Sequence, residues 1–418
     1  MDREQTESAL APYRALDLTD EKGFLCGRIL GDLGADVIKI EPPGGDPARN
    51  IGPFYHDEPH PEKSLYWLAY NCNKRGVSLN IETNDGKEIF KKLVKNADFV
   101  IESFPPGHMS RLGLGYATLK EINPGIIMVS ITHFGQTGPY KDYEGTDLIH
   151  MAMSSYMYTS GDTDRPPVRI SVPQAYLQGG LEAAVGAMVA FHRRQLAGKG
   201  QWVDVSVRDS IVRSAHITRP WWDINRQILR RAGPFRTGLS ASFGQQEIWP
   251  CKEGAVNYYT TGGVGGARTN RALVQWMDEE GMADDFLKTM DWDKFDMATV
   301  SKEVYAGLER RVGEFFLSHT SKELYEGAKK RRIMLYPVAD IKDLTENEHI
   351  MARGFWAKVE HPELGATITY PGASVRCSET PLKILRRAPL IGEHNEEVYQ
   401  KIGLSKNELL MLKQSSVI

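Results

Sequence analysis

The spacing of apolar residues near the start of the chain predicts a strand–helix–strand unit between residues 16 and 41. A short apolar run at 16–18 precedes a helix in which Leu25, Ile29 and Leu33 are four positions apart. Gly34 then ends that helix, and residues 37–40 (VIKI) form a buried strand without strict alternation. This pattern indicates a parallel βαβ unit.

The same alternation of strands and helices continues to about residue 207. A helix capped by Asn84 or Asp85 is expected to bury Ile89, Phe90, Leu93 and Val94. Strands are predicted at 99–101, 126–131 and 202–207, and a helix at 177–194 stacks Leu181, Val185, Met188 and Val189. We therefore expect an α/β fold, with a mostly parallel sheet covered on both faces.

The pattern of apolar, glycine and charged residues changes after this part of the chain. Residues 226–330 contain a Gly-rich turn and charged helical stretches, and short strands and a final helix near 395–402 follow. We predict a small domain at 226–330 and a large domain formed by 1–225 and 331–418. A chain of 418 residues is long enough for two cores.

Composition excludes several function classes. A net charge of -3 gives no basic excess for nucleic acid, and no run of 18 apolar residues suggests a membrane span. The four cysteines, Cys26, Cys72, Cys251 and Cys377, lack metal-ligand or disulfide spacing, so we expect buried thiols, no metal site and a cytoplasmic protein.

Two stretches offer groups that bind ligands in other proteins, but neither sequence signal is specific for one chemistry. The Gly-rich turn at 260–266 (TTGGVGG) can bring backbone N–H groups against an anion, although most such turns are only turns. Residues 219–223 (RPWWD) offer a cation and aromatic faces, or simply a packing cluster. The usual dinucleotide, P-loop, zincin and α/β-hydrolase motifs are absent from the sequence.

A series of ordered segments carries a resemblance to a known family. The segments are GADVIKIEP at 34–42, NCNKR at 71–75, ESFPPG at 102–107, RLG at 111–113, FGQ at 134–136, GPY at 138–140, GKGQ at 198–201, ARGF at 352–355, RAP at 387–389 and GEH at 392–394. Together they resemble the class III CoA-transferases of the formyl-CoA and carnitine type, over nearly the whole of 16–418.

The resemblance implies a Rossmann-like large domain, an inserted small domain and a dimer of interlocked rings. It also implies that an acyl-CoA and a small carboxylic acid are substrates, with no tightly bound cofactor. In the family, an aspartate acts as covalent nucleophile. That aspartate stands four residues before a glycine that matches Gly180, with Gly186 and Gln201 in register, so its position is occupied by Tyr176.

Tyrosine is a poor replacement, because a phenol with a reference pKa near 10 gives an aryl ester rather than a mixed anhydride. Asp162, Asp164 and Glu182 are the nearest acids in the sequence. We therefore expect no catalytic residue in this chain.

The resemblance also implies coenzyme A contacts at Leu79, Ser103, Phe104 and Arg111, with Arg111 holding a phosphate or, alternatively, forming a surface ion pair. Some family positions differ here. Ser103 replaces an asparagine, Pro42 replaces an arginine, and the loop at 20–22 is one residue short.

Three functions follow from these observations. The first is a CoA-transferase subunit that pairs with a homologous chain carrying the aspartate. One arrangement in the family uses two such chains to move CoA from succinyl-CoA to benzylsuccinate in anaerobic toluene degradation. The second is an acyl-CoA racemase or lyase on the same fold, with His133, His150 or Asp147 as the base. The third is a catalytically silent CoA-binding protein.

Overall fold

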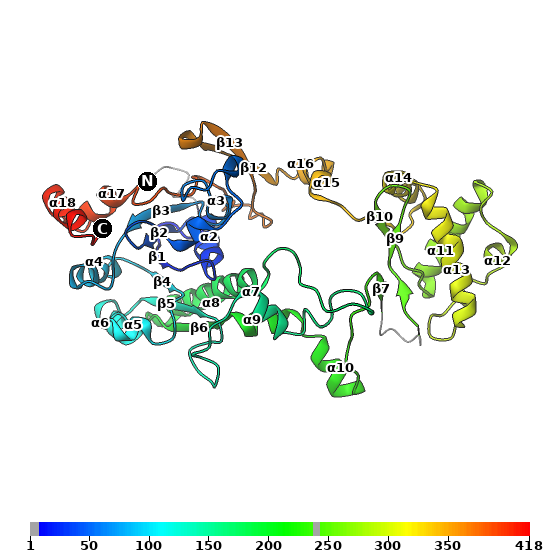
Figure 1. Ribbon diagram of the computed structural model, residues 1–418, viewed down its shortest axis with the longest axis horizontal. Coiled ribbons are helices and arrows are strands. Elements are labelled where there is room, and N and C mark those ends of the chain that lie inside the picture. The colour runs from blue at the N-terminus through cyan, green and yellow to red at the C-terminus, as the bar shows by residue number, and fades with distance from the viewer. Residues whose placement is uncertain (1–7, 237–242) are drawn as a thin grey trace. The chain divides into compact units, whose positions relative to one another are not determined.

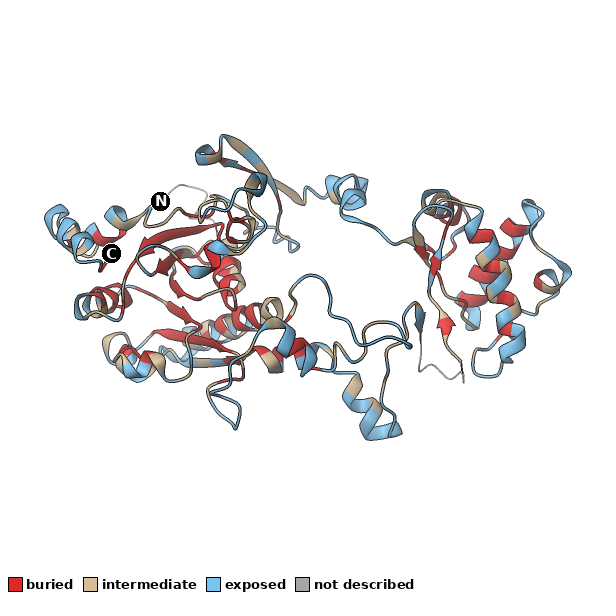
Figure 2. Ribbon diagram, in the orientation of Figure 1, coloured by how far each residue is buried: buried red, intermediate tan, exposed pale blue. Residues whose placement is uncertain are grey.

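The computed structural model describes residues 8–236 and 243–418, which form two compact units (Figure 1). Unit 1 comprises residues 1–154, 170–215 and 348–418, and unit 2 comprises residues 155–169 and 216–347. Each unit has its own buried core, shown in red in Figure 2. In the described part of the chain, no helix combines the length and the apolar character needed to span a bilayer.

Unit 1 is built on a six-stranded sheet in which all neighbouring strands are parallel. The strand order is β3-β2-β1-β4-β5-β6, so the direction of winding reverses between β1 and β4. This is the Rossmann-type order, which leaves a crevice at the carboxyl ends of the strands on either side of the reversal. The strands are β1 (Arg14–Leu18), β2 (Asp36–Glu41), β3 (Lys74–Ser78), β4 (Phe99–Glu102), β5 (Ile127–Thr132) and β6 (Trp202–Ser206).

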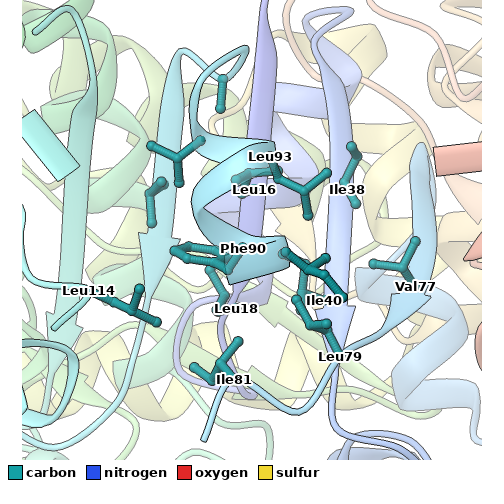
Figure 3. Close-up of a cluster of buried hydrophobic side chains, with 14 of the residues drawn as sticks. Leu16, Leu18, Ile38, Ile40, Val77, Leu79, Ile81, Phe90, Leu93 and Leu114 are labelled. Carbon is teal, nitrogen blue, oxygen red and sulfur yellow. The ribbon is translucent and has the colours of Figure 1, made fainter. Parts of the chain in front are cut away.

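Helix α4 (Asn84–Val94) covers one face of this sheet as its pattern predicts. Phe90 and Leu93 lie over Leu16 and Ile38 in the same buried cluster (Figure 3). The helix begins one residue earlier than expected, because the Thr83 hydroxyl accepts a hydrogen bond from the Gly86 N–H and is the N-cap. The predicted caps Asn84 and Asp85 are wrong by one or two positions.

The other face is covered by α2 (Phe24–Asp32), α8 (Ala175–Ala197) and α9 (Val207–Ser214). The four-residue spacing in α2 identified the wrong face, since Leu25 and Ile29 are only half-buried while Phe24, Cys26 and Leu30 are buried. Glycine explains the close approach between helices: a Cβ on Gly180 would lie 2.9 Å from Cβ of Leu25.

Helix α8 buries its small residues and exposes its large ones, the reverse of the expected core stripe. Its buried positions are Ala175, Gly179, Gly180, Ala183, Ala184, Ala187 and Ala190. Leu181, Val185 and Val189 are 45%, 50% and 61% exposed. Together with Ile29 and Met188 they border a shallow apolar groove on unit 1.

Residues from the end of the sequence complete the core of unit 1. A hairpin of β12 (Trp356–His361) and β13 (Ala366–Pro371) is followed by α17 (Asn395–Gln400) and by α18 (Lys406–Gln414), which the sequence analysis missed. Val398, Tyr399 and Val417 join the cluster beneath α4. The remaining helices of unit 1 are α3 (Leu65–Tyr70), α5 (His108–Arg111), α6 (Tyr116–Ile122), α7 (Asp147–Ala152) and α16 (Glu348–Ala352), with 3-10 turns at Pro47–Asn50, Tyr55–Asp57 and Pro362–Leu364.

Unit 2 packs helices around an antiparallel sheet of β9 (Ile248–Pro250), β10 (Ala255–Asn257) and β11 (Tyr336–Pro337). Its core is rich in aromatic residues, among them Trp249, Trp276 and Phe316. The other elements are α10 (Thr218–Asn225), β7 (Phe235–Arg236), β8 (Gln245–Gln246), α11 (Gly263–Glu279), α12 (Asp285–Lys288), α13 (Lys302–Leu317), α14 (Ser321–Arg331) and α15 (Ile341–Thr345).

The cysteines follow the sequence prediction at three positions. Cys26, Cys72 and Cys251 are free and buried, whereas Cys377 is free and exposed, so the expectation of a buried thiol is wrong there. Cys377 follows the β12–β13 hairpin, in a stretch of mostly exposed residues without regular structure. Among the described residues, no group of three or more His, Cys, Asp or Glu side chains is placed to hold a metal ion.

Candidate functional site

A cavity of about 1040 Å³ opens at the carboxyl ends of the parallel strands in unit 1. Its walls come from the segments that follow β1, β2, β3, β4 and β5, which is where an α/β sheet of this order places its ligands. The two strands flanking the reversal, β1 and β4, contribute Asp20, Lys22, Ser103 and Phe104.

The four residues expected to contact coenzyme A all line this one cavity. Leu79 is buried and also belongs to the core cluster under α4 (Figure 3). Phe104 stacks on His108, with ring centroids 4.7 Å apart. Arg111 stands at the end of α5 with an exposed side chain. The structure thus brings together residues that are up to 32 positions apart in the sequence.

Ser103 is held by the short loop that follows β1. Its hydroxyl donates to Oδ1 of Asp20 and accepts from the Asp20 N–H, both at 2.8 Å. The Asp20 carboxylate also accepts from the N–H of Lys22 at 3.1 Å and pairs with the Lys22 ammonium. Ser103 and the 20–22 loop are therefore in direct contact.

Two further acids on the cavity wall, Glu41 and Asp46, have buried cationic partners. Glu41 forms a bidentate pair with Arg49, with contacts of 2.6 and 2.8 Å, and Asp46 lies 3.4 Å from Lys39. The carboxyl end of β2 is thereby fixed by ion pairs that have little contact with water, and breaking such a pair leaves an unpaired buried charge.

Tyr176 lies in the first turn of α8, beside two histidines. Its ring centroid is 6.2 Å from that of His133 and 6.3 Å from that of His150. Oδ1 of Asp147 accepts hydrogen bonds from the backbone N–H groups of Gln174 and Ala175, at 2.9 and 2.7 Å, and so fixes the start of α8. Tyr176 itself is not on the cavity wall, but His133 is.

Burial sets the protonation of these side chains. It raises the pKa of Tyr176, and the nearby carboxylates of Glu21 and Asp20 raise it further, so the phenol is neutral at physiological pH. Burial lowers the pKa of His133 and of His150 to about 4, and the charge of Lys22 adds to the effect on His133. Both imidazoles are therefore neutral.

The pairing of the two histidines indicates which nitrogen of each carries the proton. Nδ1 of His133 lies 2.9 Å from Nε2 of His150, and the buried Nδ1 of His150 has no hydrogen-bond partner among the described residues. A buried N–H without an acceptor is less favourable than a bare nitrogen without a donor. We therefore assign His150 Nε2–H as the donor, which leaves His133 with Nε2–H as a donor of its own.

Within unit 1, the acids that act on Tyr176 differ from those that sequence distance selected. Glu182 is paired with Arg213 at 2.7 Å, and Asp162 and Asp164 belong to unit 2. The structure instead brings Asp20 and Glu21 within electrostatic range of Tyr176. The only sequence signal for this loop was its length, which gave no indication of its distance from Tyr176.

Neither low-specificity stretch contributes to the cavity. The Gly-rich turn at 260–266 forms the start of α11, where a Cβ on Gly266 would lie 2.1 Å from the backbone oxygen of Thr261. Residues 219–223 lie in α10, where Arg219 pairs with Asp223 at 2.7 Å. Both stretches belong to unit 2.

Most of the chain also matches a known protein family. Residues 12–395 match the sequence model described as CoA-transferase family III. The chain belongs to this family. The family predicted from the sequence is thereby confirmed, and the parallel sheet of unit 1 confirms the predicted α/β class.

Curated members of CoA-transferase family III align over most of the chain. The succinyl-CoA:(R)-benzylsuccinate CoA-transferase subunit BbsE of Thauera aromatica is 34% identical, over 95% of each protein. The succinyl-CoA–D-citramalate CoA-transferase of Chloroflexus aurantiacus is 31% identical, over 95% of this chain and 94% of that one. The succinyl-CoA–L-malate CoA-transferase beta subunit of the same organism is 29% identical, over 100% of both.

A solved structure shows the same fold. The crystal structure of a CAIB/BAIF family protein from Brucella suis matches with a TM-score of 0.81 and 26% identity, over 94% of this chain and 99% of that one.

Proposed function

We propose that this chain is the non-catalytic subunit of a class III CoA-transferase. In this proposal the enzyme moves CoA from succinyl-CoA to an organic acid, with benzylsuccinate as the acid and anaerobic toluene degradation in the cytoplasm as the setting. A homologous chain carrying the aspartate supplies the nucleophile. The relatives named above support succinyl-CoA as donor, and two of them, the benzylsuccinate and L-malate proteins, are named as subunits.

Tyr176 is the observation that carries this proposal. The family reaction begins when a carboxylate attacks the thioester carbonyl, which forms a mixed anhydride and releases the CoA thiolate. The thiolate then attacks the enzyme carbonyl and frees the first acid. A neutral phenol with a raised pKa cannot take this role, and Tyr176 is such a group.

The carboxylates around Tyr176 have other roles. Asp147 caps α8, and Asp20 is held by Ser103 and Lys22. Glu21 is partly buried, and burial raises its pKa. A carboxylate that is engaged by donors or disfavoured in its charged form is a poor nucleophile, so these acids do not replace the aspartate.

The cavity of unit 1 is the proposed binding site for the CoA thioester. Arg111 holds a phosphate at the exposed edge, and the stacked rings of Phe104 and His108 offer an aromatic face to the adenine. Leu79, Ser103 and His133 also line this cavity. The volume of about 1040 Å³ is at the upper end of the range for small-molecule sites.

The exposed face of α8 supports a second chain as partner. A helix that is apolar on both sides is normally buried on both sides, and unit 1 covers only the face made of small residues. We propose that the homologous subunit contributes to covering Leu181, Val185 and Val189, within a pair of interlocked rings. Such obligate pairs bury large apolar surfaces.

The racemase or lyase alternative is disfavoured by the state of the histidines. An imidazole with a pKa of about 4 is a weak base for removing a proton next to a thioester. Asp147, the third candidate base, is already engaged, because its Oδ1 accepts hydrogen bonds from the two backbone N–H groups at the start of α8.

Co-expression tests the proposal. We expect that an aspartate-bearing homologue and this chain co-purify in equal amounts. We also expect that hydroxylamine or borohydride trapping of acyl-CoA labels the homologue alone. Activity of this chain by itself with succinyl-CoA and an acceptor acid, or a label on this chain, would contradict the proposal.

A further inference from the structure

The outward side of α8 has the residue spacing of a helix that packs against a second helix. Four residues define this seam: Leu181, Val185, Met188 and His192, separated by four, three and four positions. An alternation of three and four is the pattern of a short coiled-coil contact, in which side chains of one helix insert between those of the other. Within unit 1, the opposite side of α8 is the buried one, so the seam has no facing helix there.

A hollow of about 430 Å³ runs along this seam. Ile29 of α2, Ala184 and Val189 complete its border together with the seam residues. Ala184 is small and buried, whereas Val189 is 61% exposed, so the hollow has a low floor and raised apolar sides. Only His192 brings a polar side chain to it. The hollow therefore suits apolar side chains of another helix rather than a polar ligand.

A homologous chain has a helix that can occupy this position. When two chains of one fold pair about a two-fold or near two-fold axis, the same patch on each chain is in contact. An axis through the middle of the seam, between Val185 and Met188, reverses the direction of the second helix. Val185 then faces the partner position aligned with Met188. Leu181 faces the position aligned with His192.

The charges at the two ends of α8 favour this antiparallel direction. Near the start, Glu182 has a partly exposed carboxylate, which it shares with Arg213. Near the end, Arg193 is exposed and makes no ion pair with a described residue. An antiparallel helix with the same distribution of charge places its acidic start beside Arg193, and the two helix dipoles then oppose each other favourably. A parallel helix would place like charges side by side.

We infer that α8 of this chain packs antiparallel against α8 of the homologous subunit, with Val185 opposite the position aligned with Met188. This inference rests on the proposed function, because it takes the aspartate-bearing homologue as the occupant of the hollow. The pairing has a consequence for the reaction. At 1.5 Å per residue, Tyr176 and the homologue's aligned aspartate are about 30 Å apart along the helix pair. The aspartate therefore serves the homologue's own cavity and does not reach the surroundings of Tyr176.

Disulfide trapping in the two-chain complex tests the pairing. Cys377→Ser first removes the exposed native thiol. Val185→Cys is then combined with a homologue substituted by cysteine at the position aligned with Met188. We expect mild oxidation to join the two chains as the main product, because facing seam positions come close enough for a disulfide. The control homologue has its cysteine at the position aligned with Val185, and this combination is expected to cross-link poorly.

Leu181→Glu tests whether the seam contributes to assembly. A carboxylate in an apolar helix contact is expected to weaken association with the homologue by about tenfold or more, measured by calorimetry or by titrated co-purification. Leu410→Glu, in α18, is the matched control and leaves association unchanged. Leu181 and Leu410 are 45% and 57% exposed, so neither substitution disturbs the core of unit 1, and circular dichroism checks that both variants fold.

Three outcomes overturn the inference and leave the proposed subunit role intact. They are an assembled complex without the expected cross-link, main cross-linking between the two positions aligned with Val185, and normal association of Leu181→Glu. Failure of the two chains to assemble at all overturns the proposed function, and the inference with it.

Discussion

The hydroxyl of Ser103 donates a hydrogen bond to Oδ1 of Asp20 and accepts one from the Asp20 backbone N–H, each at 2.8 Å. The two residues follow β4 and β1, the strands on either side of the winding reversal. The contact therefore joins the loop after β1 to the carboxyl end of β4. It also fixes the loop that presents Lys22 to the cavity.

Loss of this contact is expected to destabilise unit 1. Ser103→Ala removes a donor and an acceptor that face a charged side chain, so the free energy of unfolding falls by about 1–2 kcal/mol. Urea denaturation followed by circular dichroism measures the change. Thr132→Val is the matched control, because that hydroxyl has no partner among the described residues and its removal does not destabilise the chain. Equal losses in the two variants would show that the Ser103 contact contributes nothing specific.

The buried carboxyl of Glu102 is expected to make the unfolding free energy of the chain depend on pH. Burial raises the pKa of this carboxyl from 4.5 to about 7, so between these values the folded chain binds a proton that the unfolded chain has lost. The resulting stabilisation is complete below pH 4.5 and disappears as the pH rises through 7. At about 1.4 kcal/mol per pKa unit, it amounts to about 3 kcal/mol.

Glu102→Gln isolates this contribution, because glutamine stays neutral and can still accept from the Phe104 N–H. Relative to the variant, the unaltered chain is expected to lose up to about 3 kcal/mol of unfolding free energy between pH 4.5 and pH 8.5. A constant difference across that range would mean that Glu102 titrates normally.

Restoring the aspartate alone is not expected to restore an enzyme. Tyr176→Asp supplies a carboxylate, but the resemblance described at the level of sequence leads us to expect that Ser103, Pro42 and the 20–22 loop still position the thioester poorly. We expect steady-state turnover of the variant without its partner to stay at least about 100-fold below that of the two-chain complex. Turnover close to that of the complex would show that Tyr176 is the sole defect.

Packing between α2 and α8 depends on Gly180. The Cβ introduced by Gly180→Ala would lie 2.9 Å from Cβ of Leu25, so the helices must separate, at a cost of about 1–3 kcal/mol. Gly265→Ala, in α11, meets no atom within 4 Å and is expected to raise helix stability by up to about 1 kcal/mol. Thermal unfolding of both variants checks the opposite signs.

The sequence predicted the sheet well because buried parallel strands are short apolar runs, as at 37–40 and 99–101, and because Gly34 and Gly198 mark helix ends. It failed where packing decided the outcome. The spacing of Leu181, Val185 and Val189 is that of a core stripe, yet close contact between helices requires small residues, and so the Ala and Gly face is the buried one.

The candidate site was predictable only in part. Leu79, Ser103, Phe104 and Arg111 came from matching motifs, and they line one cavity. The pairing of His133 with His150 and the approach of Asp20 to Tyr176 depend on loop geometry between distant strands. Periodicity and spacing carry no information about such contacts.

The order in which the chain is synthesised has a consequence for the core of unit 1. Val398, Tyr399 and Val417 pack into the cluster that contains Leu16 and Ile38, and the Asn80 N–H donates to the Val417 carbonyl at 2.7 Å. The first strands therefore leave the ribosome long before the residues that cover them. All six strands of the sheet are translated by residue 206, but the cluster beneath α4 lacks these C-terminal side chains while residues 216–347 of unit 2 are made, and during this interval its apolar surface is open to non-native association.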